Sequence, residues 1–579
     1  MKGFWKPLKR YRRECVLGPA FKLLEAIFEL IVPLIIAHLV DDGLRLHSRP
    51  VVLHCVLLLA LMAVLGLIAS VTAQYFAARA AIGFSCGLRH RLFSHIQSLS
   101  FLDLDLLGTS TLITRLTGDI NQVQTGINLA LRLLLRSPFV VFGAMVMACS
   151  IDTRSLIIFF GVILLLFLIV FGIILGAMPM QKKVREKLDH VTGATRENLS
   201  GVRVIRAFVQ EQAQMQHFNH LNNLLTDVQL HTGRITAAMN PLTFLVLNGA
   251  IVLLLHTGAL RVESGTMSQG QLIALYNYLG QILVELVKLA NLIVTLTKSG
   301  ACARRINDIL SVAPSQKDGC IPVPSEPGEL VFDDVSVRYT DSGDPSLEHI
   351  SFTAYPGQTI GVIGGTGSGK TTLVNAIPRF YDISTGCILL SGHDLREYTL
   401  SSLRSSVGIV PQKAALFRGT IRSNLLWGNP DADDDTLWEA LSAAQCSDII
   451  RQKELGLDEP VEEGGTNFSG GQRQRLTIAR ALVRKPAVLI LDDSASALDY
   501  ATDASLRKAL RKLSFTPITF IVSQRIASVR YADQILVLED GKCVGCGTHN
   551  ELLRSCEIYR EISAAQQENA DGSEGGAGA

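Results

Sequence analysis

The first half of the chain is a series of long apolar stretches separated by polar connections. Six stretches are each long enough to cross about 30 Å of hydrocarbon as a helix. They lie near residues 16–40, 51–77, 127–150, 155–179, 237–260 and 270–296. This pattern predicts an all-α domain of six transmembrane helices within residues 1–312.

The connections between these stretches are unequal in length. Two of them, 78–126 and 180–236, are long, polar and compatible with helices that continue past the membrane, with tight bends near 101–110 and 198–204. Both are dense in lysine and arginine, so the positive-inside rule places them, and both ends of the domain, in the cytoplasm. Residues 1–13 mix aromatic and cationic side chains, which is typical either of a segment at an anionic membrane surface or of a disordered basic tail.

Several charged residues fall inside the apolar stretches. They are Lys22, Glu25 and Glu29 in the first stretch, Arg132 and Arg136 in the third, and Glu285 and Lys288 in the sixth. A charge in hydrocarbon is costly and usually faces a cavity or a partner helix. One interpretation is a polar translocation pathway, and the other is local pairing or snorkelling near helix ends. The sequence leaves both open.

The pattern changes in the second half of the chain. Residues 313–328 are rich in proline and predict a linker. Across 329–566, short apolar runs alternate with glycine turns and amphipathic segments, which predicts an α/β domain. Residues 567–579 are polar and rich in glycine, which is typical of a flexible tail.

The bulk composition limits the partners of this protein. Of 579 residues 48% are apolar, and the formal net charge is +2. This balance gives no argument for nucleic acid as a partner, whereas the apolar content indicates burial in a lipid bilayer. The eleven cysteines are scattered, and Cys543 and Cys546 form the only C-x-x-C, so free thiols rather than a metal site are predicted.

The clearest chemical motif is Gly364-Gly-Thr-Gly-Ser-Gly-Lys-Thr371, which follows the apolar run 359–363. A strand, a glycine turn and a helix start form a P-loop, in which backbone N–H groups point at the phosphates of a nucleotide. The lysine adds a positive charge for the β- and γ-phosphates, and the final threonine hydroxyl can ligate Mg²⁺. The nucleotide-binding residues predicted here are Gly364, Gly365, Thr366, Gly367, Ser368, Gly369, Lys370, Thr371 and Thr372.

Further candidates flank the P-loop in the sequence. Tyr339, about 25 residues earlier, is predicted to stack on adenine. Asp492 ends the buried run 488–492 and is suited to hold Mg²⁺ through water. Gln412 can reach Mg²⁺ or the attacking water, so the predicted metal site consists of Thr371, Gln412 and Asp492.

Two more runs complete a fixed order of motifs, namely Phe468-Ser-Gly-Gly-Gln472 and Ser496-Ala-Leu-Asp499. With these runs the chain resembles the ATP-binding-cassette transporters over about residues 1–565, in the exporter arrangement of one six-helix membrane domain fused to one cassette. The run 468–472 is the most specific, because other P-loop ATPases lack it. By this resemblance the segment 197–208 is similar to the second intracellular loop of such exporters.

The resemblance also implies a second half-transporter. Two cassettes of this family associate head to tail, and each ATP lies between the P-loop of one cassette and the signature run of the other. In this chain the signature run is residues 468–472. Ser469, Gly470, Gly471 and Gln472 are then expected to contact the ATP held by the partner's P-loop.

Two positions depart from the family pattern. The family places a glutamate, which polarises the attacking water, where this chain has Asp493, and a switch histidine where it has Gln524. Asp493, Gln524 and Gln412 are therefore the predicted catalytic group of an attenuated site. A homodimer would contain two such sites, so the resemblance favours the non-catalytic half of a heterodimeric bacterial exporter, whose partner supplies the glutamate and the histidine.

The expected function is ATP-driven export of small or amphiphilic substrates across the bacterial cytoplasmic membrane by a multi-pass protein, with the cassette in the cytoplasm. ATP and Mg²⁺ are the expected cofactors, and the substrate stays open between small molecules, lipids and peptides. An alternative is an ATP-gated regulatory membrane subunit with little hydrolysis, which the intact signature run disfavours. The six spans argue against a soluble P-loop ATPase, and the fusion of the two domains argues against an importer.

Overall fold

The computed structural model describes residues 4–324, 326, 328–339, 343–494 and 498–574. The chain divides into two compact units, one of residues 1–97 and 109–312 and one of residues 98–108 and 313–579. The division after residue 312 coincides with the predicted start of the linker. The short segment 98–108, predicted as part of the membrane domain, instead packs within the second unit.

The first unit is entirely helical. In chain order its helices are η1 (Lys6–Tyr11), α1 (Arg12–His38), η2 (Leu39–Leu44), α2 (Arg49–Ser98), α4 (Thr109–Thr114), η3 (Arg115–Asp119), α5 (Ile120–Leu133), α6 (Arg136–Ile151), α7 (Ser155–Ser200), α8 (Val202–Ala207), α9 (Glu211–Ala237), α10 (Met239–Glu263) and α11 (Gln269–Ser311). Grouped into continuous helical segments, six of those in the described residues are long and apolar enough to cross a membrane, which confirms the predicted fold class of this half.

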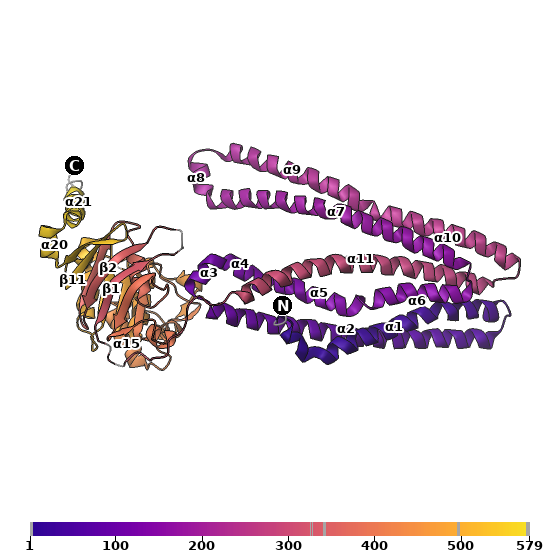
Figure 1. The fold of residues 1–579 in the computed structure, drawn as a ribbon, viewed down its shortest axis with the longest axis horizontal. Coiled ribbons are helices and arrows are strands. Elements are labelled where there is room, and N and C mark those ends of the chain that lie inside the picture. Colours follow the sequence, from indigo (N-terminus) through magenta and orange to yellow (C-terminus); the bar gives the residue numbers. More distant parts are fainter. Residues whose placement is uncertain (1–3, 325, 327, 340–342, 495–497, 575–579) are drawn as a thin grey trace. The chain divides into compact units, whose positions relative to one another are not determined.

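The long helices pack in two groups (Figure 1). α11 lies along α1, α5 and α6, whereas α7 lies along α9 and α10. α2 has 50 residues, which at 1.5 Å per residue gives a length of about 75 Å, more than twice the hydrocarbon thickness. The polar connections are therefore helical, as predicted, and α8 overlaps the bend expected near 198–204.

The second unit is an α/β domain joined by α3 (Phe101–Leu107). Its other helices are α12 (Lys370–Ala376), α13 (Leu400–Ser406), α14 (Ile421–Leu425), α15 (Asp434–Ala443), α16 (Ser447–Arg451), η4 (Gly456–Asp458), η5 (Glu463–Gly465), α17 (Gly470–Val483), α18 (Tyr500–Leu510), α19 (Ile526–Val529), α20 (His549–Ser555) and α21 (Glu557–Glu574). Its strands are β1 (Leu330–Val337), β2 (Leu347–Ala354), β3 (Thr359–Gly364), β4 (Thr385–Leu390), β5 (His393–Asp394), β6 (Val407–Val410), β7 (Gly419–Thr420), β8 (Pro460–Val461), β9 (Val488–Asp492), β10 (Ile518–Val522), β11 (Gln534–Glu539) and β12 (Lys542–Gly547).

The strands form two main sheets. One is six-stranded in the order β12-β11-β3-β10-β9-β6, parallel except for the terminal β12, and the other is antiparallel in the order β2-β1-β4-β5. β9 and β10 are buried at every residue, as expected for central parallel strands covered on both faces. Because β3, β9 and β10 are adjacent and parallel, their carboxyl ends meet at one edge.

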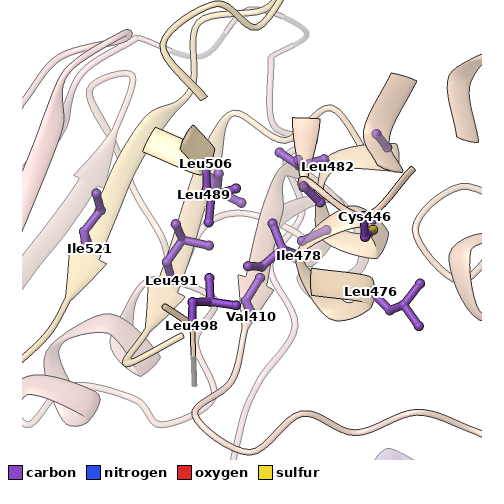
Figure 2. Packing of buried hydrophobic residues seen from close by; sticks show 14 of the residues in the cluster. Val410, Cys446, Leu476, Ile478, Leu482, Leu489, Leu491, Leu498, Leu506 and Ile521 are labelled. Carbon is purple, nitrogen blue, oxygen red and sulfur yellow. The ribbon is translucent and has the colours of Figure 1, made fainter. Parts of the chain in front are cut away.

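Two apolar clusters hold the second unit together. In one, Leu489 and Leu491 of β9 pack against Ile478 and Leu482 of α17 (Figure 2). The other lies between the two sheets and includes residues of β1, β3 and α12. Buried side chains thus fix α17, the helix that carries the signature run, to the central sheet. Burial of apolar surface stabilises such packing by about 25 cal/mol per Å².

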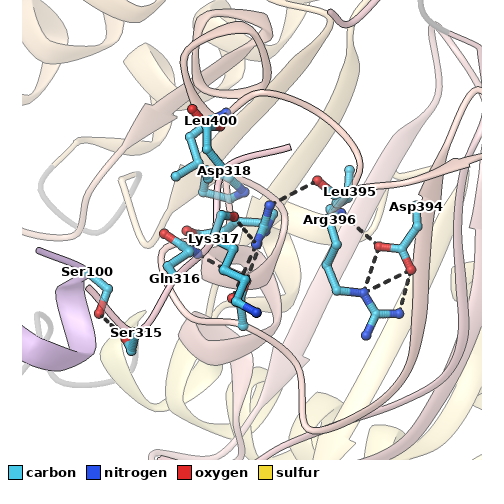
Figure 3. A network of polar contacts seen from close by, with 12 residues as sticks. Ser100, Ser315, Gln316, Lys317, Asp318, Asp394, Leu395, Arg396 and Leu400 are labelled. Atoms are coloured by element: carbon cyan, nitrogen blue, oxygen red, sulfur yellow. Dashed lines mark hydrogen bonds and ion pairs between the residues drawn. The ribbon is translucent and has the colours of Figure 1, made fainter. Parts of the chain in front are cut away.

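The linker residues 313–328 are bound to the α/β domain rather than free of it (Figure 3). Gln316 donates to the Arg379 carbonyl at 2.9 Å, and the Asp318 carboxylate accepts the Leu400 N–H at 2.6 Å. The predicted flexible tail 567–579 lies in α21 as far as Glu574, and residues 575–579 lie outside the described residues, so its flexibility stays a prediction.

Candidate functional site

The P-loop connects the end of β3 to the start of α12. Gly369 adopts φ 94°, which L-residues rarely reach, and a Cβ there would lie 2.6 Å from the Ser346 carbonyl oxygen. Only glycine meets both conditions, so this position fixes the curl of the loop. The backbone then enters α12 with Lys370 as its first residue.

Lys370 lies across the loop in this structure. Its Nζ donates to the carbonyls of Gly364 and Gly365 and to Ser368 Oγ. Burial lowers the pKa of Lys370, and the nearby carboxylates of Asp493 and Asp492 partly offset this shift. These bonds hold the ammonium group against the loop that is expected to receive phosphate.

Two cavities adjoin the glycine turn of the P-loop. One, of about 450 Å³, is lined by residues 344–346, 367–372 and 540–541. The other, of about 130 Å³, lies where the carboxyl ends of β3, β9 and β10 meet. It is lined by Thr366, Gly367, Lys370, Thr371, Gln412, Asp492, Asp493, Val522, Ser523 and Gln524. The structure thus brings the predicted catalytic and metal-binding residues to one place.

Asp492 is the last residue of β9 and is 6% exposed. Its Oδ1 accepts a hydrogen bond from Thr371 Oγ1 at 3.4 Å. Burial, together with the charge of Asp493, raises the pKa of Asp492, although the Thr371 bond and Lys370 oppose the shift. A carboxylate beside a hydroxyl oxygen is a donor set that fits Mg²⁺, so these two residues can hold this ion.

Asp493 has a constrained backbone and a polar neighbour. Its φ is 46°, in the left-handed region, and its N–H donates to the Val522 carbonyl at 2.9 Å. Gln412 Nε2 donates to Asp493 Oδ2 at 3.3 Å. The two predicted catalytic side chains therefore contact each other directly, and the strand pairing of β9 with β10 fixes the Cα of Asp493.

Gln524 follows β10 on an exposed turn beside the same cavity. The turn is held from α21 by Gln566, whose Nε2 donates to the Gln524 carbonyl at 2.7 Å and whose Oε1 accepts the Ile526 N–H at 2.9 Å. The Gln566 side chain thus bonds the backbone of Gln524 and of Ile526, one residue on each side of Arg525. Sequence reasoning missed Gln566, since no motif marks it.

Tyr339 lies beside α12. Its hydroxyl donates to Thr372 Oγ1 at 3.0 Å, and its ring packs edge-on against Tyr381 with 4.8 Å between the ring centroids. An aromatic side chain is therefore present next to the P-loop helix, and its stacking on adenine stays a prediction. Tyr381 was not identified from the sequence, because it lies in no motif.

The signature run starts α17. Ser469 is the N-cap: its Oγ accepts the Gln472 N–H at 3.3 Å, and Gln472 Oε1 accepts the Ser469 N–H at 3.0 Å. This reciprocal pair leaves the N–H groups of Gly470 and Gly471 at an exposed helix start, which suits an anion. Of the described residues that line the two P-loop cavities, none comes from 469–472. Ser496 and Ala497 of the predicted Ser496–Asp499 motif lie outside the described residues.

Comparison with known proteins gives the family. Residues 16–286 match the family model for the ABC transporter transmembrane region, and residues 347–496 match the model for the ABC transporter. An uncharacterized ABC transporter ATP-binding protein of Mycobacterium tuberculosis is 34% identical over 569 residues, 97% of each chain. The ATP-dependent lipid A-core flippase of Hahella chejuensis is 30% identical over 524 residues, 89% of this chain and 88% of that protein.

A solved structure shows the same fold. The structure of a bacterial Atm1-family ABC exporter with ATP bound superposes with a TM-score of 0.78 and 23% identity, covering 96% of this chain and 98% of that one. The six long apolar helices and the matched domains make this chain a multi-pass membrane protein with an ATP-binding domain. It belongs to the ABC transporter family, as an ATP-hydrolysing half-transporter of the exporter type with its membrane domain fused to its ATP-binding cassette.

Proposed function

We propose that this chain is one half of a heterodimeric exporter and that its own P-loop site binds ATP but hydrolyses it slowly. The observation that carries the proposal is the pair Asp493 and Gln524 beside an otherwise complete site. The Asp493 side chain is one methylene shorter than the family's glutamate, so its carboxylate starts about 1.5 Å further from the attacking water. A misplacement of about 1 Å can cost on the order of a hundredfold in rate.

The switch position adds to the attenuation. Glutamine can donate a hydrogen bond to the γ-phosphate, but it cannot take up a proton as histidine can. The hydrogen bond from Gln412 to Asp493 supports the same conclusion, because it occupies one oxygen of the shortened carboxylate. Mg²⁺ would be held by Thr371, Asp492 and Gln412. The ion would neutralise part of the negative charge on the phosphates.

The second role of the chain is to complete the partner's site. Ser469, Gly470 and Gly471 form an intact, exposed helix start. On association head to tail, these N–H groups would close on the γ-phosphate bound by the partner's P-loop. Fast hydrolysis would occur there, and closure of the cassettes would be transmitted through the long helical loops to turn the membrane helices from inward-facing to outward-facing.

Export of an amphiphilic or other small substrate across the bacterial cytoplasmic membrane is the transport activity proposed. The lysine and arginine content of the two long loops supports a cytoplasmic position of the cassette and both termini. The Hahella chejuensis flippase, which spans most of the same length, supports a lipid-like substrate. An ATP-gated regulatory membrane subunit with little hydrolysis is the second candidate, and the preserved capping of the signature helix argues against it.

The test is ATPase activity of the chain co-expressed with its partner in membranes. We expect Asp493→Asn to lower total turnover less than twofold, and glutamine in place of the partner's glutamate to abolish it. Ser469→Ala, which lies on this chain, should lower turnover at the partner's site by tenfold or more, about 1.4 kcal/mol. Loss of all activity on Asp493→Asn alone would overturn the division of labour, and full activity of Ser469→Ala would exclude the shared site.

A further inference from the structure

The third span is interrupted inside the membrane. α5 ends at Leu133 and α6 begins at Arg136, within the predicted span 127–150. Pro138, in the first turn of α6, has no N–H to continue the helical hydrogen bonds, which explains the break. Leu134 and Leu135, between the two helices, keep right-handed helical φ and ψ values, so the span is kinked rather than unwound. Proline in a membrane helix frees a backbone carbonyl that neighbouring polar groups must satisfy, so the break marks a polar place in the bundle.

A neutral ion network lies at this break. Arg136 donates to Glu29 of α1 and to Glu285 of α11. Ser137 and Lys288 both donate to Glu285, each at 2.8 Å. The side chains of Arg136 and Glu285 are only 6% and 3% exposed, so α1, α6 and α11 enclose the pair. The buried Arg136 and Glu285 pair with each other, as buried charges must, and the partly exposed Glu29 and Lys288 complete a balance of two cations and two carboxylates.

Arg132, one turn before Arg136, is not part of this balance. Among the described residues it has no ion-pair partner, and its Nε is buried without a hydrogen bond. Asn128 Oδ1, a further turn back, and Gln281 Oε1 on α11 are also buried and unsatisfied. With Arg136 Nε these are all the buried, unsatisfied side-chain polar atoms that the described residues contain, and each lies on α5, α6 or α11.

The spacing places these groups along one seam. Residues 128, 132 and 136 are four apart, and so are 281 and 285, so each set faces one side of its segment. The contact between Arg136 and Glu285 shows that the two sides meet. Buried polar atoms without partners are rare in proteins, and a cluster of them calls for a ligand or for water.

The charge and the surroundings define the ligand. Arg132 leaves one uncompensated positive charge, and a guanidinium group favours carboxylate or phosphate. Leu134, Leu135 and Phe139 expose 48%, 55% and 38% of their surface at the same break, so an apolar body would find contacts there. Unsatisfied acceptors on Asn128 and Gln281 can receive hydrogen bonds from hydroxyl or amide groups.

We propose that this seam, named here the Arg132 site, binds the single anionic group of an amphiphile beside the neutral network of Arg136. The proposal rests on the proposed export function and names its substrate class. The same headgroup chemistry can come from an exported amphiphile or from an anionic membrane lipid.

The test measures binding without ATP, so that it is independent of the cassette. The transporter, together with its partner chain, is placed in nanodiscs of phosphatidylcholine and titrated with dodecyl phosphate and with dodecyltrimethylammonium. We expect the anion to bind at least tenfold more tightly than the cation. Arg132→Gln should remove this preference and Arg132→Lys should keep most of it, whereas Lys182→Gln, which removes an exposed cation outside the predicted spans, should change nothing.

Equal affinity for the two probes, or a preference that survives Arg132→Gln, would overturn the proposal. If Arg132→Gln fails to assemble, the comparison of the two probes on the unmodified protein still decides. Adding phosphatidylglycerol to the nanodiscs separates the two sources: competition identifies a membrane lipid, and undiminished binding of dodecyl phosphate identifies a free amphiphile. Either result supports an anionic ligand, and neither depends on how fast the site at Asp493 hydrolyses ATP.

Discussion

Lengthening the carboxylate at position 493 is predicted to restore hydrolysis at this chain's own ATP site. Asp493→Glu adds one carbon–carbon bond, about 1.5 Å, between a Cα that the pairing of β9 with β10 fixes and the carboxylate. The present Oδ2 lies 3.3 Å from Gln412 Nε2 and just reaches that neighbour. The longer side chain would extend past it into the cavity of about 130 Å³ shared with Lys370 and Gln524.

The magnitude follows from the displacement. A change of about 1 Å in the position of a catalytic group corresponds to roughly a hundredfold in rate, or about 2.7 kcal/mol of barrier. Because Gln524 stays in the switch position, we expect Asp493→Glu alone to recover at least tenfold, and the double change Asp493→Glu with Gln524→His to recover more. Gln524→His supplies an imidazole group, which can carry a proton.

The assay needs a complex in which the partner's ATP site does not hydrolyse ATP. In a complex whose partner carries glutamine instead of its catalytic glutamate, the remaining phosphate release comes from this chain's P-loop. Turnover is compared for the unmodified chain, Asp493→Glu and the double variant, with Asp493→Asn as the matched control that keeps the short side chain and removes its charge. Turnover within twofold of the unmodified chain in both longer variants would refute the reasoning that carboxylate reach limits this site.

Three further predictions concern the cassette itself. Gln566→Ala should expose the backbone after β10, so amide hydrogen exchange at Ile526 should quicken by about tenfold, and unchanged protection would contradict the clamp. Gly369→Ala should destabilise the cassette by about 1–3 kcal/mol in thermal unfolding, because φ is 94° and a carbonyl would lie 2.6 Å from the new methyl group, whereas Gly470→Ala, with no atom within 4 Å, should not. Burial raises the pKa of Asp492, so the ionised carboxylate destabilises the nucleotide-free cassette at a pH above this pKa. Asp492→Asn should therefore raise the melting temperature at pH 7.5. This increase in melting temperature should disappear toward pH 4, where the carboxyl group is protonated.

The chain's local patterns determined the architecture well. Apolar stretches of about 20 residues have one stable solution in a bilayer, so six transmembrane helices follow from hydropathy alone. The order of motifs likewise predicted the nucleotide site, because a P-loop and a strand-terminal carboxylate need particular residues at particular spacings. Asp493 and Gln524 were recognised as unusual for the same reason, since each stands at a position defined by its neighbours in sequence.

Only the tertiary structure decided which distant side chains meet. Gln566 reaches the turn at Gln524 across 42 positions of sequence, and no local pattern encodes that contact. The intramembrane charges were ambiguous in sequence, because pairing depends on how helices rotate against each other. The structure pairs Arg136 with Glu285 over 149 positions and leaves Arg132 without a counter-ion among the described residues. Local chemistry thus predicted the elements and the motifs, whereas packing between distant segments set the partners of each charge.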